Sequence, residues 1–354
     1  MKKYLFYMCL VLCSLCLAGC RRISAGEPDG GNAGSRDEPA SREIFAMDTY
    51  MTVTAYGDNA KKAVTEAVAR ITKLDEMLSA EGETGEIAGL NACGKQILSE
   101  DALRLVESAL SLWRDTDGAF NPAIYPLMEL WGFPDRNFRV PDADELAEVL
   151  PLTNADNIVV CEESGEVSFK KDGMKLDLGG IAKGYTSAEI IRLFRENGIT
   201  KGLVSLGGNV QALGTKPDGT CWRIAIRHPY DQETYLGILE IADKAVITSG
   251  GYERYFEQDG KRYHHILDAK TGYPAQNGLV SVTIVSGDGT LADGLSTALF
   301  VMGQEKAAEY WRAHCTQFDI ILYTEDGELF VSEGISDRFT SDYPVKVVTA
   351  TQSR

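Results

Sequence analysis

The chain of 354 residues is poor in positive charge, and this excludes one broad class of function. It has 35 Lys and Arg against 52 Asp and Glu, for a formal net charge of −17. A surface with this balance repels the phosphates of nucleic acids and anionic lipid headgroups, so we expect no nucleic-acid partner. If the protein handles a polyanion, it must do so in a local pocket, with a metal ion to offset the charge.

Cysteine is sparse beyond the N-terminal segment, and no C-x-x-C pair occurs. Four cysteines remain there, widely spaced, at Cys93, Cys161, Cys221 and Cys315. This spacing argues against a thiolate metal site or a disulfide framework. We predict that the four are buried apolar residues, while a disulfide between two of them stays open.

The N-terminus has the features of a secretion signal. Lys2 and Lys3 precede an apolar run from Tyr4 to Leu15, which is shorter than the roughly 20 residues that a membrane-spanning helix needs. The run ends in Leu17-Ala18-Gly19-Cys20, which resembles a bacterial lipobox. We predict that residues 1–20 are a lipoprotein signal, with a lipid such as palmitate on Cys20. The alternative is an ordinary cleaved signal.

This prediction places the protein at the outer face of the bacterial cytoplasmic membrane or on the periplasmic side, lipid-anchored through Cys20. Loss of Lys2 and Lys3 with the signal would leave 33 basic and 52 acidic residues, a net charge of −19. Residues 21–43 are rich in Gly, Pro, Ser and charge, which predicts a flexible tether. We expect one folded domain over residues 44–348 and a short tail over 349–354.

The periodicity within the domain predicts an α+β fold with mixed, largely antiparallel sheets, flanking helices and a ligand cleft between two lobes. Ser164-Gly165, Asp172-Gly173 and Asp259-Gly260 are hairpin signals. No solenoid repeat or heptad is present. An apolar face from Val64 to Leu78 predicts one helix, and further helices are predicted after Ser99 and from about Ala182 and Leu291. Predicted strands cover 50–56, three short runs in 157–178, 203–206, 223–227, 245–248, 252–258, 261–267 and 280–285.

Three predicted strands end in a glycine pair, at Gly179-Gly180, Gly207-Gly208 and Gly250-Gly251. Neither common phosphate-binding fingerprint, G-x-x-x-x-G-K-[ST] or G-x-G-x-x-G, is present. Glycine lets a backbone approach a ligand closely, so three such ends predict a shared wall for a large flat ligand. Three unrelated tight turns are the alternative.

The segment Leu291–Thr297 predicts a metal site at the start of a helix. Asp293, Ser296 and Thr297 are spaced i, i+3 and i+4, which puts their oxygens on one helical face. One carboxylate and two hydroxyls suit Mg²⁺, with carbonyl and phosphate oxygens completing the shell. The alternative is that Asp293 only complements the helix dipole.

Two adjacent histidines, His264 and His265, follow a predicted hairpin strand. Neighbouring strand residues face opposite ways, so only one of them can point into a site. A neutral imidazole there could accept a proton from an attacking hydroxyl. The alternative is a structural histidine held by Asp268.

In order along the chain, several motifs together resemble those of the ApbE family, the FAD:protein FMN transferases. The resemblance covers nearly the whole domain. It rests on Met47-Asp48-Thr49, Gly118–Pro122, Leu176–Tyr185, Gly207-Gly208-Asn209, Thr248-Ser249-Gly250, His265–Pro274, and Ala292-Asp293-Gly294 with Thr297.

The resemblance implies an exported, Mg²⁺-dependent enzyme that moves the FMN half of FAD onto a Ser or Thr hydroxyl of a target protein and releases AMP. The implied acceptor is a subunit of a membrane redox complex. Transferred residue by residue, the family pattern implies nucleotide contacts at Met47, Ala119, Phe120, Asn121, Asp177, Lys183 and Leu267. It implies metal ligation by the Gly180 carbonyl with Asp293, Ser296 and Thr297, and we assign proton acceptance to His265.

Two positions depart from the family pattern. Glu81 stands where relatives place an aromatic ring, and Ala269 replaces a proline. Family acceptors carry Asp-x-x-Ser/Thr-Gly-Ala-Ser/Thr, and neither Ser-Gly-Ala nor Thr-Gly-Ala occurs in this chain, so the acceptor is expected to be another protein. Two alternatives remain: an FAD pyrophosphatase that uses water, and a lipoprotein that binds FAD without turnover.

Overall fold

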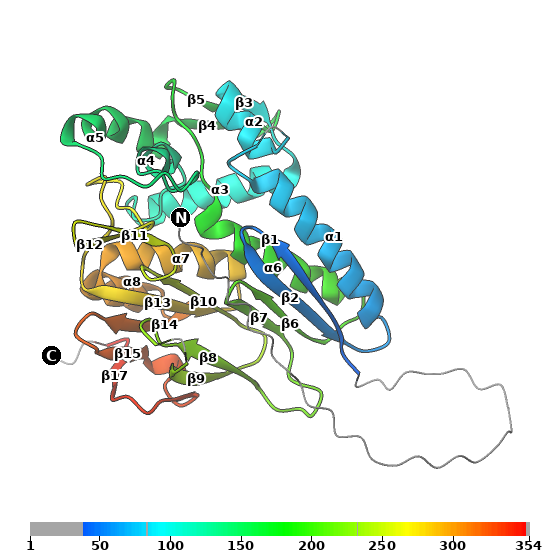
Figure 1. Ribbon diagram of the computed structural model, residues 1–354. Helices are drawn as coiled ribbons and strands as arrows, with labels where there is room; N and C mark the ends of the chain where they lie inside the picture. Colours follow the sequence, from blue (N-terminus) through cyan, green and yellow to red (C-terminus); the bar gives the residue numbers. More distant parts are fainter. Residues whose placement is uncertain (1–37, 83, 232, 352–354) are drawn as a thin grey trace, which may run out of the picture. The chain divides into compact units, whose positions relative to one another are not determined.

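The computed structural model describes residues 38–351 apart from Glu83 and Gln232, and these residues belong to one compact unit. The predicted signal, the lipidation of Cys20 and most of the predicted tether lie outside the described residues. Eight α-helices are found in the described part (Figure 1). They are α1 (Ala60–Leu78), α2 (Glu86–Cys93), α3 (Glu100–Asp115), α4 (Tyr125–Leu130), α5 (Ala143–Val149), α6 (Gly179–Glu196), α7 (Gly289–Met302) and α8 (Gln304–His314).

A mixed sheet of nine strands forms the centre of the unit, and all its pairs are antiparallel except β15 with β17. This confirms the predicted α+β class with largely antiparallel pairing. In spatial order the strands are β1 (Ala40–Ala46), β2 (Thr49–Tyr56), β6 (Lys201–Leu206), β7 (Asn209–Leu213), β10 (Ala245–Gly250), β13 (Leu279–Ser286), β14 (Phe318–Thr324), β15 (Leu329–Ser332) and β17 (Val345–Val348).

Three smaller sheets complete the β-structure. The first contains β16 (Phe339–Thr340), β9 (Tyr235–Ile241) and β8 (Trp222–Arg227). The second contains β3 (Lys95–Ile97), β5 (Glu166–Phe169) and β4 (Ile158–Cys161). The third is the hairpin of β11 (Tyr255–Gln258) and β12 (Lys261–His264). Short 3-10 helices are η1 (Leu150–Thr153), η2 (Ala155–Asn157) and η3 (Glu333–Ile335).

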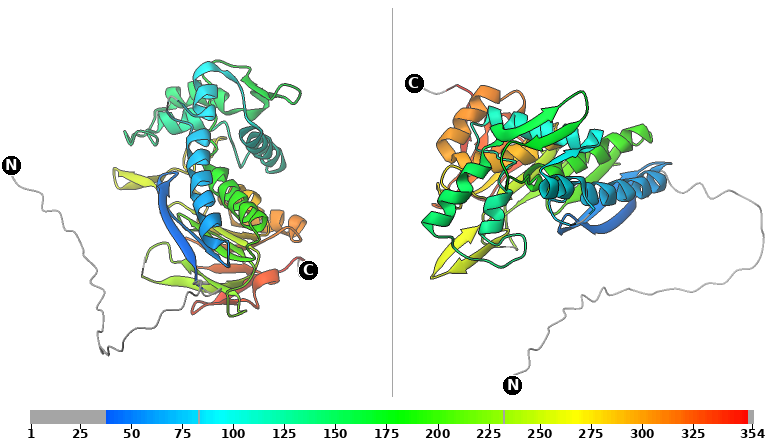
Figure 2. Two further views of the ribbon diagram at one scale, coloured as in Figure 1. Left: turned by 90° about the vertical axis from the view of Figure 1, so that its right-hand side faces the viewer. Right: turned by 90° about the horizontal axis from the view of Figure 1, so that it is seen from above.

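The large sheet is covered on both faces (Figures 1 and 2). Helices α1, α6, α7 and α8 pack on one face, and the β8–β9–β16 sheet packs on the other. Strand β13 is buried along its whole length because both layers cover it. A separate aromatic cluster joins α4 and α5 to the β11–β12 hairpin through Trp131, Phe133 and Phe256. None of the helices in the described part of the chain is long and apolar enough to cross a membrane.

Helices α6 and α7 approach each other closely at glycines, and this contact positions the site described below. A Cβ atom at Gly184 would lie 2.1 Å from the Gly289 carbonyl oxygen and 2.5 Å from Cβ of Asp293. A Cβ at Gly294 would lie 2.2 Å from Leu112 of α3. Only glycine lets the backbones meet at this separation, so the packing distance of α6 and α7 is determined by these positions.

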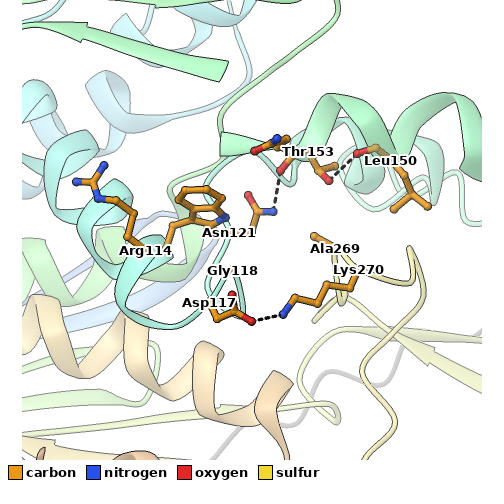
Figure 3. A pocket seen from close by; sticks show the side chains of 10 residues that line it. Arg114, Asp117, Gly118, Asn121, Leu150, Thr153, Ala269 and Lys270 are labelled. Atoms are coloured by element: carbon orange, nitrogen blue, oxygen red, sulfur yellow. Dashed lines mark hydrogen bonds and ion pairs between the residues drawn. The ribbon is translucent and has the colours of Figure 1, made fainter. Parts of the chain in front are cut away.

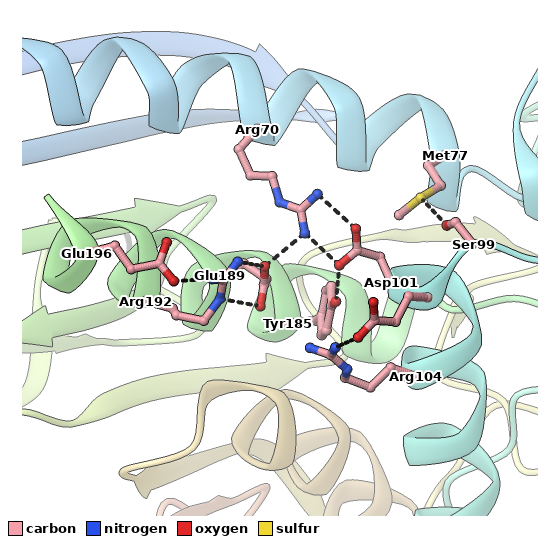
Figure 4. Close-up of polar contacts among 10 residues, drawn as sticks. Arg70, Met77, Ser99, Asp101, Arg104, Tyr185, Glu189, Arg192 and Glu196 are labelled. Carbon is pink, nitrogen blue, oxygen red and sulfur yellow. Dashed lines mark hydrogen bonds and ion pairs between the residues drawn. The ribbon is translucent and has the colours of Figure 1, made fainter.

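Helix α6 is held to α1 and α3 by a charged network (Figure 4). Arg70 donates to Asp101 at 2.6 and 2.9 Å and to Glu189 at 2.8 Å, and the Tyr185 hydroxyl donates to Asp101 at 2.8 Å. Hydrogen bonding to Arg70 lowers the pKa of the Asp101 carboxyl. Because Arg70 and Glu189 are mostly buried, removing one partner would leave an uncompensated charge, so the network fixes how α6 sits on α1 and α3.

Several predicted boundaries were wrong. Strand β1 begins at Ala40, inside the predicted tether, because an edge strand can pair its backbone with β2 while its polar side chains stay exposed. The third predicted strand of 157–178 does not form: Leu176 N donates to the Asn91 side chain and Asp177 N to the Pro122 carbonyl. Helix α6 therefore begins at Gly179, earlier than predicted.

The predicted burial of the cysteines was also wrong at two positions. Cys93 and Cys161 are exposed, while Cys221 and Cys315 are half-buried, and all four are free thiols. Cys93 ends α2 and Cys161 ends β4 at a surface turn, so the ends of these elements carry the thiols to the surface. A disulfide between two of the four, which the sequence left open, is not formed.

We predict that Gly184→Ala lowers the free energy of unfolding by about 1–3 kcal/mol, because the added methyl group overpacks the α6–α7 contact. Gly89→Ala in α2 is the matched control. Its Cβ would meet only Gln96, at 3.6 Å, so replacing a helical glycine there should stabilise the fold by up to about 1 kcal/mol. Urea unfolding measures both, and equal effects would contradict the packing argument.

Candidate active site

One face of α7 presents the three residues predicted to bind metal. Asp293 is 4% exposed, Ser296 is fully buried and Thr297 is half-buried. The Ser296 hydroxyl donates to the Asp293 carbonyl at 2.7 Å and pairs with the Ser249 hydroxyl at 2.7 Å, and Ser249 lies 3.4 Å from the Thr297 hydroxyl. The spacing therefore brings the three oxygen-bearing side chains together as predicted.

The prediction that these residues open the helix was wrong. Helix α7 begins at Gly289, and the Asp288 carboxylate caps it by accepting from Thr290 N at 2.8 Å and Leu291 N at 3.1 Å. Asp293 lies in the second turn, where the helix dipole has little effect. The alternative in which Asp293 only complements the dipole is thus not supported.

The Asp293 carboxylate is held by two segments far away in sequence. Its Oδ2 accepts from Gly184 N at 2.7 Å, and its Oδ1 accepts from Asn209 Nδ2 at 3.0 Å. In a regular helix Gly184 N would donate to the Gly180 carbonyl. Its bond to Asp293 therefore gives the Gly180 carbonyl capacity to accept a further ligand.

The three glycine pairs converge on this face of α7. A Cβ at Gly180 would lie 3.5 Å from the Thr297 hydroxyl. Gly207-Gly208 precede Asn209, which holds Asp293, and Gly250 follows Ser249, which holds Ser296. The first pair lies within α6, in its first turn, whereas the prediction had it end a strand. Each pair therefore either contacts the oxygen cluster, as Gly180 does, or adjoins a residue that holds it.

This donor set fits Mg²⁺. Burial raises the pKa of Asp293 to about 6, and the Lys183 charge opposes the rise. A buried carboxylate with hydroxyl and carbonyl oxygens around it is the hard ligand set that Mg²⁺ prefers. In residues 38–351, with 83 and 232 left aside, no three His, Cys, Asp or Glu gather in a group that could hold a metal ion.

Lys183 brings positive charge to the cluster. Burial raises the pKa values of Asp177, Glu253 and Asp293, and the charge of Lys183 opposes the rise at each. The charge of Lys183 thus acts on each of the three carboxylates, and its side chain makes no hydrogen bond or ion pair with any described residue. Asp177 itself accepts from Gly179 N at 2.7 Å.

His265 is oriented by a backbone carbonyl. Its Nδ1 lies 3.1 Å from the Arg254 carbonyl oxygen, which also accepts from His265 N at 3.0 Å. A carbonyl only accepts, so we assign the proton to Nδ1, and this leaves Nε2 with a free lone pair. Burial lowers the pKa of His265 to about 3, with Arg254, His264 and Lys183 contributing. The ring is therefore neutral and suited to accept a proton at Nε2.

The neighbouring histidine faces elsewhere, as predicted. His264 Nε2 lies 3.1 Å from the Ala275 carbonyl, and its ring packs edge-on against Phe300. Strand β12 ends at His264, before the predicted end at Leu267. The alternative was a structural histidine held by Asp268. In the structure the Arg254 carbonyl holds His265 instead.

The remaining predicted nucleotide contacts are Met47, Leu267 and the Ala119–Asn121 segment, and they lie in three separate segments of the chain. Met47 lies in the β1–β2 turn, where its N donates to Asp75 at 2.9 Å and its sulfur is 3.8 Å from the Thr186 hydroxyl of α6. Met47 and Asp48 both have positive φ, as the two central residues of a tight two-residue hairpin loop between β1 and β2 require. Leu267 is buried and bridges to Pro274, so a ligand can reach mainly its backbone.

Ala119, Phe120 and Asn121 form the third of these segments. Phe120 is buried, and its ring lies 3.2 Å from where a Cβ of Gly180 would be. The Asn121 amide donates to the Thr153 carbonyl at 2.9 Å and accepts from Ala123 N at 2.8 Å, so it also holds its own loop in place. Ala119 packs against the main core beside them.

Asn121 also lines a cavity of about 520 Å³ (Figure 3). Trp113, Ala269 and an ion pair of Lys270 with Asp117 at 2.7 Å lie around it. None of Lys183, His265 and Asp293 is among its lining residues. The cavity thus adjoins the reactive cluster at Asn121 and Ala269 and is not its centre.

Sequence reasoning missed three residues of the site. Arg254 holds His265, the charge of Lys183 acts on Glu253, and Tyr125 lies next to Glu81, where the family's aromatic ring was missing. Burial, together with the charge of Glu81, raises the pKa of the Tyr125 hydroxyl. Arg254 and Glu253 belong to the segment 252–258, which was predicted to be a strand, and no recognised motif includes either residue. Tyr125 follows the Asn121 motif closely, which was the only signal available for it.

Comparison with known proteins agrees with this geometry. The profile of the ApbE family matches residues 47–322. Two relatives, both called FAD:protein FMN transferase, come from Klebsiella pneumoniae (strain 342) and Treponema pallidum (strain Nichols). The first is 36% identical over 287 residues, covering 79% of this chain and 89% of the relative. The second is 34% identical over 333 residues, covering 87% and 90%.

Solved structures give the same result. The ApbE protein of Thermotoga maritima is 32% identical with a TM-score of 0.79, covering 84% of this chain and 98% of its own. The flavin transferase ApbE of Vibrio cholerae is 29% identical with a TM-score of 0.76, covering 85% and 99%. The class of protein is that of flavin transferases, and the chain belongs to the ApbE family.

We predict that His265 makes the stability of the protein sensitive to acid. Its pKa is about 3 in the folded chain against an ordinary 6.5, so only the unfolded chain takes up this proton as the pH falls from 6.5 towards 3. The wild-type Tm should therefore fall more steeply than that of His265→Gln between pH 6.5 and 4. Parallel Tm curves for the two proteins would refute this.

Proposed function

We propose that this chain transfers the FMN half of FAD to a Ser or Thr hydroxyl of an acceptor protein and releases AMP, with Mg²⁺ as its cofactor. Membership of the ApbE family and the names of its relatives support the reaction class. The observation that carries the proposal is the oxygen cluster on α7, where Gly184 N and Asn209 hold the buried Asp293 carboxylate beside the Ser296 and Thr297 hydroxyls.

The metal would be held by Asp293, Thr297 and the Gly180 carbonyl, with Ser296 as a further predicted ligand. Bound there, Mg²⁺ would supply charge neutralisation for a pyrophosphate. Lys183 would attract the same phosphates, because its ammonium group makes no ion pair within the described part of the chain. Asp177, Met47 and the Ala119–Asn121 segment would position the rest of the nucleotide.

The reaction needs one proton acceptor. The Ser or Thr hydroxyl oxygen of the acceptor protein attacks the FMN phosphorus, and the phosphoanhydride bond to AMP breaks. The proton of that hydroxyl passes to Nε2 of His265. A pKa of about 3 makes His265 a weak base in the ligand-free chain. A hydrogen bond from the acceptor hydroxyl to Nε2 would position the proton for its transfer to His265.

The experiment combines the full-length chain in detergent with FAD, Mg²⁺ and an acceptor protein carrying the family's target pattern. We expect an FMN-sized gain in acceptor mass together with AMP, and a loss of at least about 100-fold for Asp293→Ala. Asp288→Asn, on the same helix, should retain activity because it keeps the helix cap. AMP and free FMN with unmodified acceptor would instead identify a pyrophosphatase, and bound FAD without products a binding protein.

We also propose that the chain works at a membrane surface, anchored by lipid on Cys20, and that its acceptor is a subunit of a membrane redox complex. The lipobox-like Leu17–Cys20 segment supports the anchor. The wild-type chain should stay with membranes after a high-salt wash, and Cys20→Ser should move it to the soluble fraction. A soluble wild-type chain would point to an ordinary cleaved signal.

A further inference from the structure

The histidine assigned as the base lies at the end of a hairpin that is separate from the large sheet. Strands β11 and β12 form a two-stranded sheet of their own, in which Tyr255 pairs with His264. His265 comes next in the chain, and its N donates to the Arg254 carbonyl at 3.0 Å. A two-stranded hairpin is marginally stable by itself, so the position of His265 depends on what holds this end of the hairpin to the rest of the fold.

The side chain of Arg254 anchors this end of the hairpin. Its guanidinium group donates a hydrogen bond to the carbonyl of Phe133, a residue just after α4 and 121 positions away in the sequence. The same group lies over the Phe133 ring, with its central carbon 6.0 Å from the ring centre. Among the residues that the structure describes, Arg254 forms no ion pair. Its side chain is therefore held through Phe133.

Phe133 also packs against the base itself. The rings of Phe133 and His265 meet edge-on with their centres 6.4 Å apart, which is a favourable arrangement for aromatic rings. Phe133 is fully buried in the aromatic cluster of Trp131 and Phe256, so it offers a fixed surface. Arg254 thus contacts His265 through its carbonyl and Phe133 through its side chain, and Phe133 contacts the His265 ring. The three residues form a closed set of contacts.

The charge of Arg254 acts on the same histidine. Burial lowers the pKa of His265, and the positive charge of Arg254 contributes to the lowering. A base must be neutral before it can accept a proton. The Arg254 carbonyl in addition accepts from Nδ1 at 3.1 Å, which leaves the lone pair on Nε2. One residue therefore supports both the charge state and the tautomer of His265.

We propose that Arg254 is a positioning residue for the transfer: its side chain, anchored on Phe133, holds the carbonyl that keeps the His265 proton on Nδ1 and Nε2 free for the acceptor hydroxyl. The inference rests on the proposed function, in which His265 takes that proton. The base belongs to the hairpin and Asp293 belongs to α7, so without the anchor the two would shift relative to each other. A shift of about 1 Å in a reacting group can cost on the order of 100-fold in rate.

The kinetic test uses the full-length chain in detergent with FAD, Mg²⁺ and the acceptor protein. Arg254→Met keeps a long side chain but removes its donors and charge, and it should lower kcat about 10- to 100-fold with KM for FAD within about twofold. Arg254→Lys can still donate to the Phe133 carbonyl, so it should retain more of kcat than Arg254→Met. In a His265→Gln background, Arg254→Met should change kcat by less than about twofold, because the two residues act as a unit.

Arg262→Gln is the matched control. Arg262 lies on the same hairpin, where it pairs with Glu257 at 3.2 Å and stacks over Tyr255. Both members of this pair are exposed, so its loss should leave kcat unchanged. A rise in KM for FAD with Arg254→Met, or the same loss of kcat with and without His265, would show that Arg254 binds the substrate itself and would overturn the positioning role.

A second measurement does not depend on the transfer reaction. In the ligand-free full-length chain labelled with ¹⁵N histidine, NMR should show His265 with its proton on Nδ1, and Arg254→Met should give a mixture of the two tautomers. His265→Gln identifies the signals by their loss. Unchanged nitrogen shifts in Arg254→Met would overturn the inference even if the wild type transfers FMN. A mixture of tautomers without any transfer by the wild type would support the anchor and reject the proposed function.

Discussion

The close contact between α6 and α7 is the constraint on which the site depends. Gly184 and Gly289 let the two backbones meet, and Gly184 N then reaches the Asp293 carboxylate at 2.7 Å. The same approach brings Gly180 next to Thr297 and places Lys183 near Asp293. With larger residues the helices would move apart, and the oxygen atoms would no longer share one space. The network around Arg70 holds α6 in this position from its other side.

Charge is distributed in a way that suits an acidic protein with an anionic substrate. Most of the surface repels phosphate, while Lys183 and the Asp293 face concentrate binding in one place. The buried carboxylates have raised pKa values in the ligand-free chain, so a bound cation would relieve their desolvation.

Sequence reasoning succeeded where the signal was local. The i, i+3, i+4 spacing of Asp293, Ser296 and Thr297 predicted their common face correctly, and hairpin signals predicted the antiparallel class. It failed where a local sequence pattern is compatible with two different structures. The apolar Met174–Leu178 run looked like a strand, but its backbone groups bond Asn91 and Pro122. The Ala40–Glu43 segment looked like tether, but it pairs with β2 along an edge where polar side chains stay exposed.

The sequence by itself determined the fold class, the family and most of the candidate residues, because each of these depends on short patterns within one element. Only the tertiary structure decided which oxygen of Asp293 binds Gly184 and which binds Asn209, and that Arg254 fixes the proton on Nδ1 of His265. These contacts join residues from separate helices, strands and turns, so no local pattern of side chains can encode their distances.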